Sequence, residues 1–247
     1  MLCVLLGAIA FSLGGLFVKL IPWQPLSISS GRCIFSSLVI FLYIKASKHP
    51  FRFNKTVLIG GLCVSLMLLC YVTSIKLTTA ANAIVLEYTA PVFILLIEWI
   101  LFKKKPGKAA ILVSILVFLG ILIVVSDGLG KGNLKGDLIA LLSGVFYAFT
   151  IMLNDFDEAD PLSSVWIGHF LTMLVGLPSL LGEADHSAST LLLVMILGIF
   201  QAGAGYTLLT VGLKTIFFLH VVEGRNMGMF SMQFVSLSNV LFIPFSP

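Results

Sequence analysis

The sequence predicts an all-α membrane protein, a polytopic bundle of helices, and three observations support this prediction. Hydrophobic residues make up 59% of the 247 residues, and charged residues make up only 11%. Soluble domains carry about 25% charged residues, and one soluble core of this size cannot hide so much apolar surface. The apolar residues also form long runs separated by short loops, which is typical of an up-and-down bundle.

Eight apolar runs are long enough to cross a bilayer, because a helix rises about 1.5 Å per residue and the hydrocarbon layer is about 30 Å thick. We predict these eight spans at residues 2–21, 26–45, 56–76, 78–102, 109–126, 136–154, 162–181 and 190–214. Residues 227–243 form a doubtful ninth span, and a tenth span is absent.

The run from Leu77 to Phe102 carries the strongest internal signals. It ends in a block of lysines, which is typical of a cytoplasmic stop. Within it, the spacing of Glu87, Pro91 and Glu98 predicts that they share one helical face, and Pro91 is expected to bend the helix. Unpaired charge in hydrocarbon costs several kcal/mol, so we expect this face to turn towards protein or water.

Basic residues gather in the loops at 45–55 and 103–108. Counting loops alternately from a cytoplasmic N-terminus places nine Lys or Arg residues on the cytoplasmic side and four on the opposite side. The positive-inside rule therefore predicts a cytoplasmic N-terminus in a cell membrane, plasma or inner. The same loops account for the net charge of +4, so we expect the lipid bilayer as a partner and no nucleic acid.

The chain contains an internal repeat. The motif Pro-Leu-Ser at residues 25–27 recurs at residues 161–163, and the helices before each motif align at the same offset. The repeated unit holds five helices, and an odd number of spans inverts the second copy relative to the first. We therefore predict two inverted five-helix repeats, at residues 1–127 and 134–247, with the second incomplete.

The repeated runs also resemble a known family. The first half contains GAIAFSLGGLFVKL, PLSISSGRCIF and TTAANAIVLEYTAPVFILLIEWILFKKKP, and the second contains GDLIALLSGVFYAFTIM, DPLSSVWIGHF and GYTLLTVGLKT. Together these runs resemble the EamA-type transporters of the drug/metabolite transporter superfamily. The resemblance implies ten helices, a central cavity and movement of small metabolites, often export of amino acids or related compounds.

The chain departs from that family near its end. Met229 stands where the repeat would place the second copy of the proline, and the segment that corresponds to the helix of Glu87 contains Glu223 and Arg225, just before residues 227–243. Each charge costs roughly 2.5–3.5 kcal/mol at the centre of an inserted helix. We therefore expect this polypeptide to transport poorly. The alternative function is a non-transporting or inactive truncated membrane protein derived from such a transporter.

The sequence contains no P-loop, no metal-ligand motif and no nucleophile motif, so we expect neither enzyme activity nor a cofactor. Gradient-driven movement of a small-molecule substrate fits better, and a homodimer is left open. The candidates for the substrate cavity are polar, aromatic or helix-bending residues inside the predicted spans. They are Phe11, Ser12, Tyr71, Glu87, Tyr88, Pro91, Tyr147, Gln201 and Tyr206. Packing explains each aromatic residue equally well.

Two further ionisable residues lie within apolar runs. Arg32 follows the start of its helix closely, so we expect it to snorkel to the outer interface or to cap carbonyl groups. An ion pair with the protein or the substrate is the alternative. For His169 we favour a satisfied hydrogen-bonding role over a proton relay.

Overall fold

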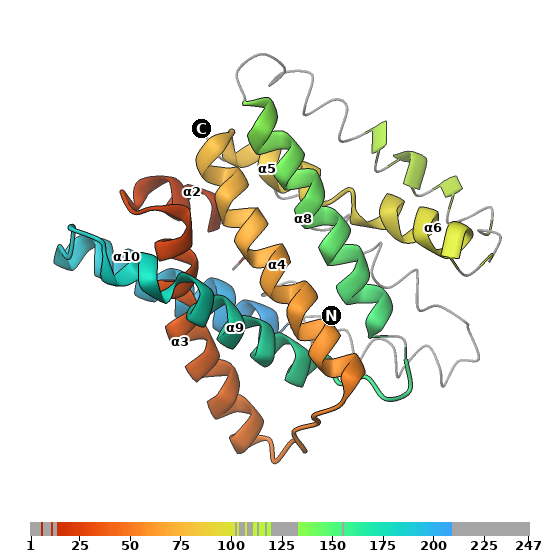
Figure 1. Ribbon diagram of the computed structural model, residues 1–247, viewed down its shortest axis with the longest axis horizontal. Helices are drawn as coiled ribbons and strands as arrows, with labels where there is room; N and C mark the ends of the chain where they lie inside the picture. Colours follow the sequence, from red (N-terminus) through yellow and green to blue (C-terminus); the bar gives the residue numbers. More distant parts are fainter. Residues whose placement is uncertain are drawn as a thin grey trace.

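The computed structural model describes residues 6, 11, 14–101, 103, 107, 111–112, 114–116, 118–119, 133–154 and 156–208. Figure 1 shows the arrangement of their helices. These are α2 (Gly14–Leu20), α3 (Pro25–Ala46), α4 (Lys55–Leu77), α5 (Ala80–Glu87), α6 (Ala90–Leu101), α8 (Leu134–Leu153), α9 (Pro161–Leu181), α10 (Ala188–Ile196) and η1 (Leu197–Gly205). The predictions for Ser12, for most of residues 2–21 and 109–126, and for the chain after residue 208 lie outside the described residues.

Six helical segments of the described chain are long and apolar enough to cross a membrane. They are Pro25–Ala46, Lys55–Leu77, Ala80–Ile100, Leu134–Leu153, Pro161–Leu181 and Ala188–Leu208. These segments coincide with six of the eight predicted spans, and their outward faces expose large apolar side chains such as Leu38, Leu62 and Leu142. Such faces suit contact with lipid, so the chain is a multi-pass membrane protein.

The two helices that begin with Pro-Leu-Ser, α3 and α9, pack against each other. The Ser27 and Ser179 hydroxyl oxygens lie 2.7 Å apart, and Trp166 Nε1 donates to the Ser37 carbonyl at 3.1 Å. The start of α3 therefore meets the end of α9, and the two helices are antiparallel. Each begins with proline, which has the fixed φ and the missing N–H that a first helical position tolerates.

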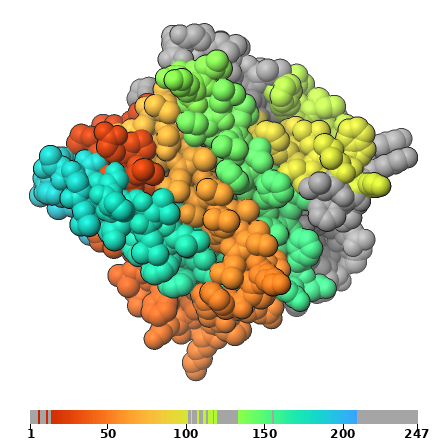
Figure 2. Space-filling view, viewed as in Figure 1, coloured from red at the N-terminus to blue at the C-terminus, as the bar shows by residue number. Residues whose placement is uncertain are grey.

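Helix α4 lies between α8 and α9. Figure 2 shows it as a diagonal band between these two helices on one face of the molecule. Glycines permit the close approach, since a Cβ at Gly61 of α4 would lie 2.5 Å from the Ile167 side chain of α9. Around this contact the buried core includes Cys33, Val64 and Leu68. The helices therefore touch through small residues, as membrane helices commonly do.

The predicted helix at 78–102 is broken in the structure. Helix α5 ends at Glu87 and α6 begins at Ala90, with a short turn in which Thr89 N donates to the Leu86 carbonyl at 3.2 Å. The physical reason is Pro91, whose nitrogen carries no hydrogen for the Glu87 carbonyl. The helix bend expected from Pro91 is therefore present as a break between α5 and α6, and the shared face of Glu87, Pro91 and Glu98 stays a prediction.

The predicted helix at 190–214 also changes character. Helix α10 continues into η1, a nine-residue π-helix from Leu197 to Gly205. π-Helical segments are rare and frequently occur at functional sites. This one contains three glycines and a buried glutamine, Gln201. The π-helix therefore contains Gln201, the polar residue that we predict as a site candidate in this span.

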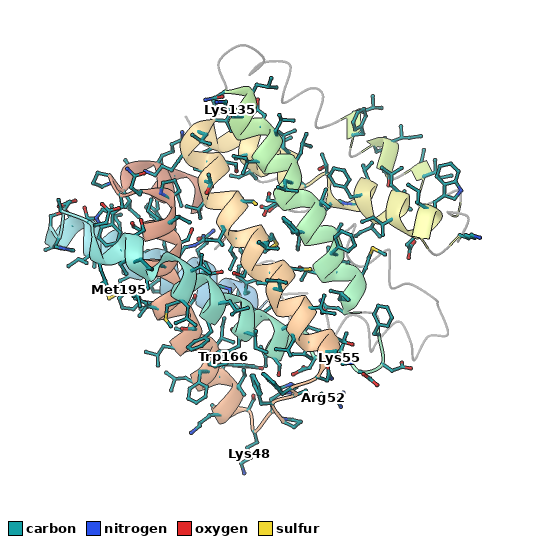
Figure 3. The ribbon with its side chains drawn as sticks, viewed as in Figure 1. Lys48, Arg52, Lys55, Lys135, Trp166 and Met195 are labelled. Carbon is teal, nitrogen blue, oxygen red and sulfur yellow. The ribbon has the colours of Figure 1, made fainter. Side chains whose placement is uncertain are left out.

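Hydrogen bonds join the first half (residues 14–101) to the second half (residues 133–208) at both ends of the bundle. At one end, His49 Nε2 lies 2.9 Å from both carboxylate oxygens of Asp160, and Asn54 Nδ2 donates to the Glu158 carbonyl at 2.7 Å. Figure 3 shows Lys48, Arg52 and Lys55 at this end and Lys135 at the opposite end. The basic loop at 45–55 thus lies at the end that these bonds tie together.

The opposite end is tied by residues that precede α3 and follow α4. Trp23 Nε1 donates to the Asp185 carbonyl at 2.7 Å, and the Thr78 hydroxyl donates to the Asp137 carboxylate at 2.7 Å. The Thr190 hydroxyl donates to the Asp185 carboxylate, and this bond lowers the pKa of that carboxyl. A charged acceptor therefore orders the loop that Trp23 contacts.

Candidate substrate site

Arg32 of α3 is buried in the bundle, with only 1% of its surface exposed. Its Nη1 lies 3.4 Å from Gln201 Oε1, whereas Nε and Nη2 have no hydrogen-bond partner among the described residues. The expectation that Arg32 snorkels to the interface is therefore wrong, because α9 and η1 pack over α3 at this level. A buried charge that is only partly paired costs several kcal/mol, so Arg32 is a candidate for function.

His169 of α9 is fully buried near Arg32. The Ser36 hydroxyl lies 2.6 Å from His169 Nδ1, and Cys33 Sγ lies 3.6 Å from the same nitrogen. In contrast, Nε2 has no partner among the described residues. The ring packs edge to face on Tyr206, with centroids 5.2 Å apart. The histidine therefore satisfies one of its two ring nitrogens and leaves the other available.

Two glycines set the position of Gln201. A Cβ at Gly14 of α2 would overlap the Gln201 amide nitrogen, so glycine makes room for the side chain there. A Cβ at Gly198 of η1 would lie 2.6 Å from the Arg32 carbonyl oxygen. The η1 backbone therefore lies directly on α3, which brings the glutamine to the guanidinium.

Glu87 brings the opposite charge to the same region. It is half-buried at the end of α5 and interacts electrostatically with Arg32, although the two side chains form no direct ion pair in the described structure. A Cβ at Gly144 of α8 would lie 3.0 Å from the Glu87 carbonyl oxygen, so α8 passes close to the end of α5. We call Arg32, Glu87, His169 and Gln201 the polar cluster.

Aromatic residues surround the polar cluster. The hydroxyls of four tyrosines lie close enough to Glu87 to interact electrostatically, namely Tyr71, Tyr88, Tyr147 and Tyr206. The Tyr206 ring also packs edge to face on Phe11, with centroids 4.8 Å apart. These residues come from different helices, so the aromatic surroundings form only when the bundle folds.

The structure thus brings together most of the candidates from the sequence. Phe11, Tyr71, Glu87, Tyr88, Tyr147, Gln201 and Tyr206 lie in this region, and the buried Pro91 marks the helix break beside it. Arg32 and His169 are outside the predicted cavity set, although a substrate ion pair is the alternative for Arg32 and a proton relay the less favoured role for His169. The signal that identifies them is an ionisable side chain inside an apolar span, which is a functional candidate by default.

The arrangement suits the binding of a polar or ionic small molecule. Charged and hydrogen-bonding groups converge from α3, α5, α9 and η1, within a bundle whose outer surface is apolar. Among the described residues, no group of three or more His, Cys, Asp or Glu side chains is placed to hold a metal ion. A few polar groups among aromatic side chains are the usual composition of a small-molecule site.

Comparisons with known proteins identify relatives. Human solute carrier family 35 member G1 is 29% identical over 223 residues, which cover 81% of this chain and 61% of that protein. The mouse protein of the same name is 27% identical over 193 residues, which cover 70% of this chain and 51% of that protein. The chain therefore spans only part of the length of these relatives.

A solved crystal structure of a protein has a similar fold. It aligns with a TM-score of 0.65 over 98% of this chain and 95% of that chain, at 15% sequence identity, so the likeness concerns the fold alone. The model of the EamA-like transporter family matches residues 1–126, just over half of the chain. Because of this match and the similarity to the solute carrier proteins, the chain belongs to the EamA-like transporter family of the drug/metabolite transporter superfamily.

Proposed function

We propose that the protein moves a small metabolite across a cell membrane through the centre of its bundle. The observation that carries this proposal is the polar cluster, in which Arg32 and Glu87 lie among membrane-spanning helices without a direct ion pair. Charges at such depth are costly, and transporters use them to bind substrates or to relay protons. Membership of a transporter family supports the same role.

The packing of α3 and α9 supports an inverted repeat around this site. Both helices begin with Pro-Leu-Ser, and they run antiparallel through the Ser27–Ser179 and Ser37–Trp166 contacts. Equivalent helices of inverted repeats run in opposite directions, and transporter sites commonly lie between such repeats. Arg32 and His169 lie on these two helices, so the proposed site lies between the proposed repeats.

The finer features of the proposal are gradient-driven export, a substrate of the amino acid class or a related compound, and a cytoplasmic N-terminus. Glu87 is the proposed proton-binding group, because it is the carboxyl of the polar cluster and lies within an apolar span. Intramembrane carboxyls of this kind act as proton relays in pumps and transporters.

Flux through proteoliposomes tests the proposal. The full chain is reconstituted, and efflux of radiolabelled amino acids is measured across a series of pH values for the wild type and Glu87→Gln. We expect a weak wild-type efflux that changes with pH and a flat profile for Glu87→Gln, because glutamine cannot exchange a proton. Glu158→Gln is the matched control, since Glu158 lies exposed in the loop between α8 and α9.

Two outcomes contradict the proposal. Unchanged pH dependence in Glu87→Gln would return this carboxyl to a packing role. Absence of efflux for every amino acid and related metabolite tested, in protein that unfolds cooperatively on heating, would favour the non-transporting alternative.

A further inference from the structure

One edge of the Arg32 guanidinium has no hydrogen-bond partner of good geometry among the described residues, although the Cys33 thiol lies beside the guanidinium and interacts with it. Its Nη1 faces Gln201 Oε1 at 3.4 Å, while the two unpartnered nitrogens in the described structure are Nε and Nη2. In the rigid planar fork of arginine, the hydrogens of Nε and Nη2 point in the same direction, side by side. The two unpaired N–H donors therefore lie side by side and can bind one ligand together.

That edge has the geometry of a carboxylate receptor. A carboxylate accepts two parallel N–H bonds from such a fork, and charge-assisted bonds of this kind are roughly twice as strong as neutral ones. Buried polar groups nearly always have partners, and Arg32 is 1% exposed. A single water molecule would satisfy a donor, but it would leave the positive charge uncompensated in a medium of low dielectric constant.

We propose that the Nε–Nη2 edge of Arg32 is a subsite for the carboxylate of a transported metabolite. This inference rests on the proposed function and names the chemical group that its site recognises. Gln201 is the positioning residue, because its oxygen occupies the third nitrogen and leaves the fork free. Gly14 and Gly198 hold Gln201 there, since a side chain at either position would displace η1 or its glutamine.

The surroundings favour a carboxylate over a more highly charged anion. Glu87 lies within electrostatic reach of Arg32, so a second negative charge on the guest would be repelled by this carboxyl. The remaining polar atom without a partner in this described region is His169 Nε2, which offers a ligand one hydrogen-bonding position. One fork, one nearby carboxyl and several aromatic rings match a small organic monoanion better than phosphate.

Ligand pairs that differ only in charge provide the first test. Purified full-length protein is titrated with acetate, benzoate and succinate and with their amides, acetamide, benzamide and succinamide, while its unfolding temperature is recorded. Inorganic phosphate is included as the competing oxyanion. We expect a saturable rise in unfolding temperature with at least one carboxylate, at least about tenfold weaker binding of its amide, and weaker binding of phosphate.

Two variants identify the residue responsible. Arg32→Lys keeps the positive charge but removes the fork, and should reduce carboxylate affinity at least about tenfold without changing the response to the amide. Gln201→Glu places a carboxylate beside Nη1 of Arg32 and leaves the Nε–Nη2 edge chemically intact. Because this carboxylate offsets the positive charge of the guanidinium, the variant should bind carboxylates more weakly although it still contains Arg32. This second variant keeps the proposal testable if Arg32→Lys does not fold.

Several results would overturn the subsite. These are equal binding of carboxylate and amide, no binding of any carboxylate at millimolar concentration, tighter binding of phosphate, or unchanged affinity in both folded variants. Flux measurements separate this inference from the proposed function. Carboxylate binding without flux would support the subsite and contradict the proposed transport function. Flux of a neutral metabolite that does not depend on Arg32 would support transport and contradict the subsite.

Discussion

Single residues determine how closely η1 approaches α3. At Gly198, an added Cβ would lie 2.6 Å from both the Arg32 carbonyl oxygen and the Phe35 Cβ. Neither atom belongs to the flexible end of a side chain, so relief requires the two backbones to separate. Gln201 lies on the same segment and would move away from Arg32 with it. The absence of a side chain at Gly198 therefore allows Gln201 to reach Arg32.

Gly198→Ala should destabilise the protein. Overpacking of this kind costs about 1–3 kcal/mol, because neighbouring atoms must shift to relieve the contact. Thermal unfolding in detergent measures the effect as a lower unfolding temperature. Gly182→Ala is the matched control, since its Cβ would meet only ordinary contacts, the nearest at 3.6 Å. Equal unfolding temperatures for the two variants would show that η1 can move away from α3 without loss.

Glu87, Tyr147 and Gln201 could be predicted as site residues because they are polar side chains inside apolar runs, a property that the sequence displays directly. The burial of Arg32 could not be predicted in the same way. It depends on α9 and η1 covering α3, and these segments are remote from Arg32 along the chain. Position within a helix predicts whether a side chain can snorkel only when its neighbours are known.

The helices begin and end where local chemistry dictates. The Asn54, Thr79 and Ser187 side chains each accept a bond from the first turn of the following helix, and Asp160 does the same for α9. These caps follow from the known preference for short polar side chains. The break before Pro91 follows from the missing N–H of that residue, whereas the π-helix η1 could not be predicted, because hydropathy records length and not hydrogen-bonding register.

Asp160 should stabilise α9 mainly as its N-cap. The carboxylate accepts from Ser163 N at 3.3 Å and also pairs with His49. Asp160→Ala should cost about 1–2 kcal/mol, the usual loss on removing a cap, whereas Asp160→Asn keeps a good capping residue and should cost less. Unfolding temperatures of the two variants distinguish the roles. A loss in Asp160→Asn as large as that in Asp160→Ala would assign the stabilisation to the His49 pair.

At the scale of the whole molecule, the membrane class and six of the spans could be predicted from composition and run length. The relation between the halves is visible in the sequence as the repeated Pro-Leu-Ser motif and the aligned helices before it. Its spatial consequence, the antiparallel packing of α3 and α9, depends on serines and glycines that leave no periodic signal. Such contacts form between helices, so a pattern within one helix does not reveal them.

The orientation of the bundle gives a prediction at this scale. Ser47 and Ala184 are exposed in loops at opposite ends. With a cytoplasmic N-terminus, a membrane-impermeant maleimide should label Ala184→Cys in intact cells and Ser47→Cys only after permeabilisation. The unsubstituted chain supplies the baseline, since Cys33 is buried and Cys63 and Cys70 are half-buried. Labelling of Ser47→Cys from outside would reverse the orientation.

The hydrogen bonds that tie the two halves together at both ends have a consequence for substrate affinity. Opening either end has to break its own set, and each net bond is worth about 0.5–1.5 kcal/mol. Two such bonds correspond to about 1–3 kcal/mol, so in the proposed transport cycle either end would be open in between about one molecule in six and one in a hundred and sixty. The apparent affinity for substrate that enters from one side falls by the fraction of molecules open on that side. A substitution that removes the hydrogen bonds at one end would therefore raise the apparent affinity for substrate from that side alone.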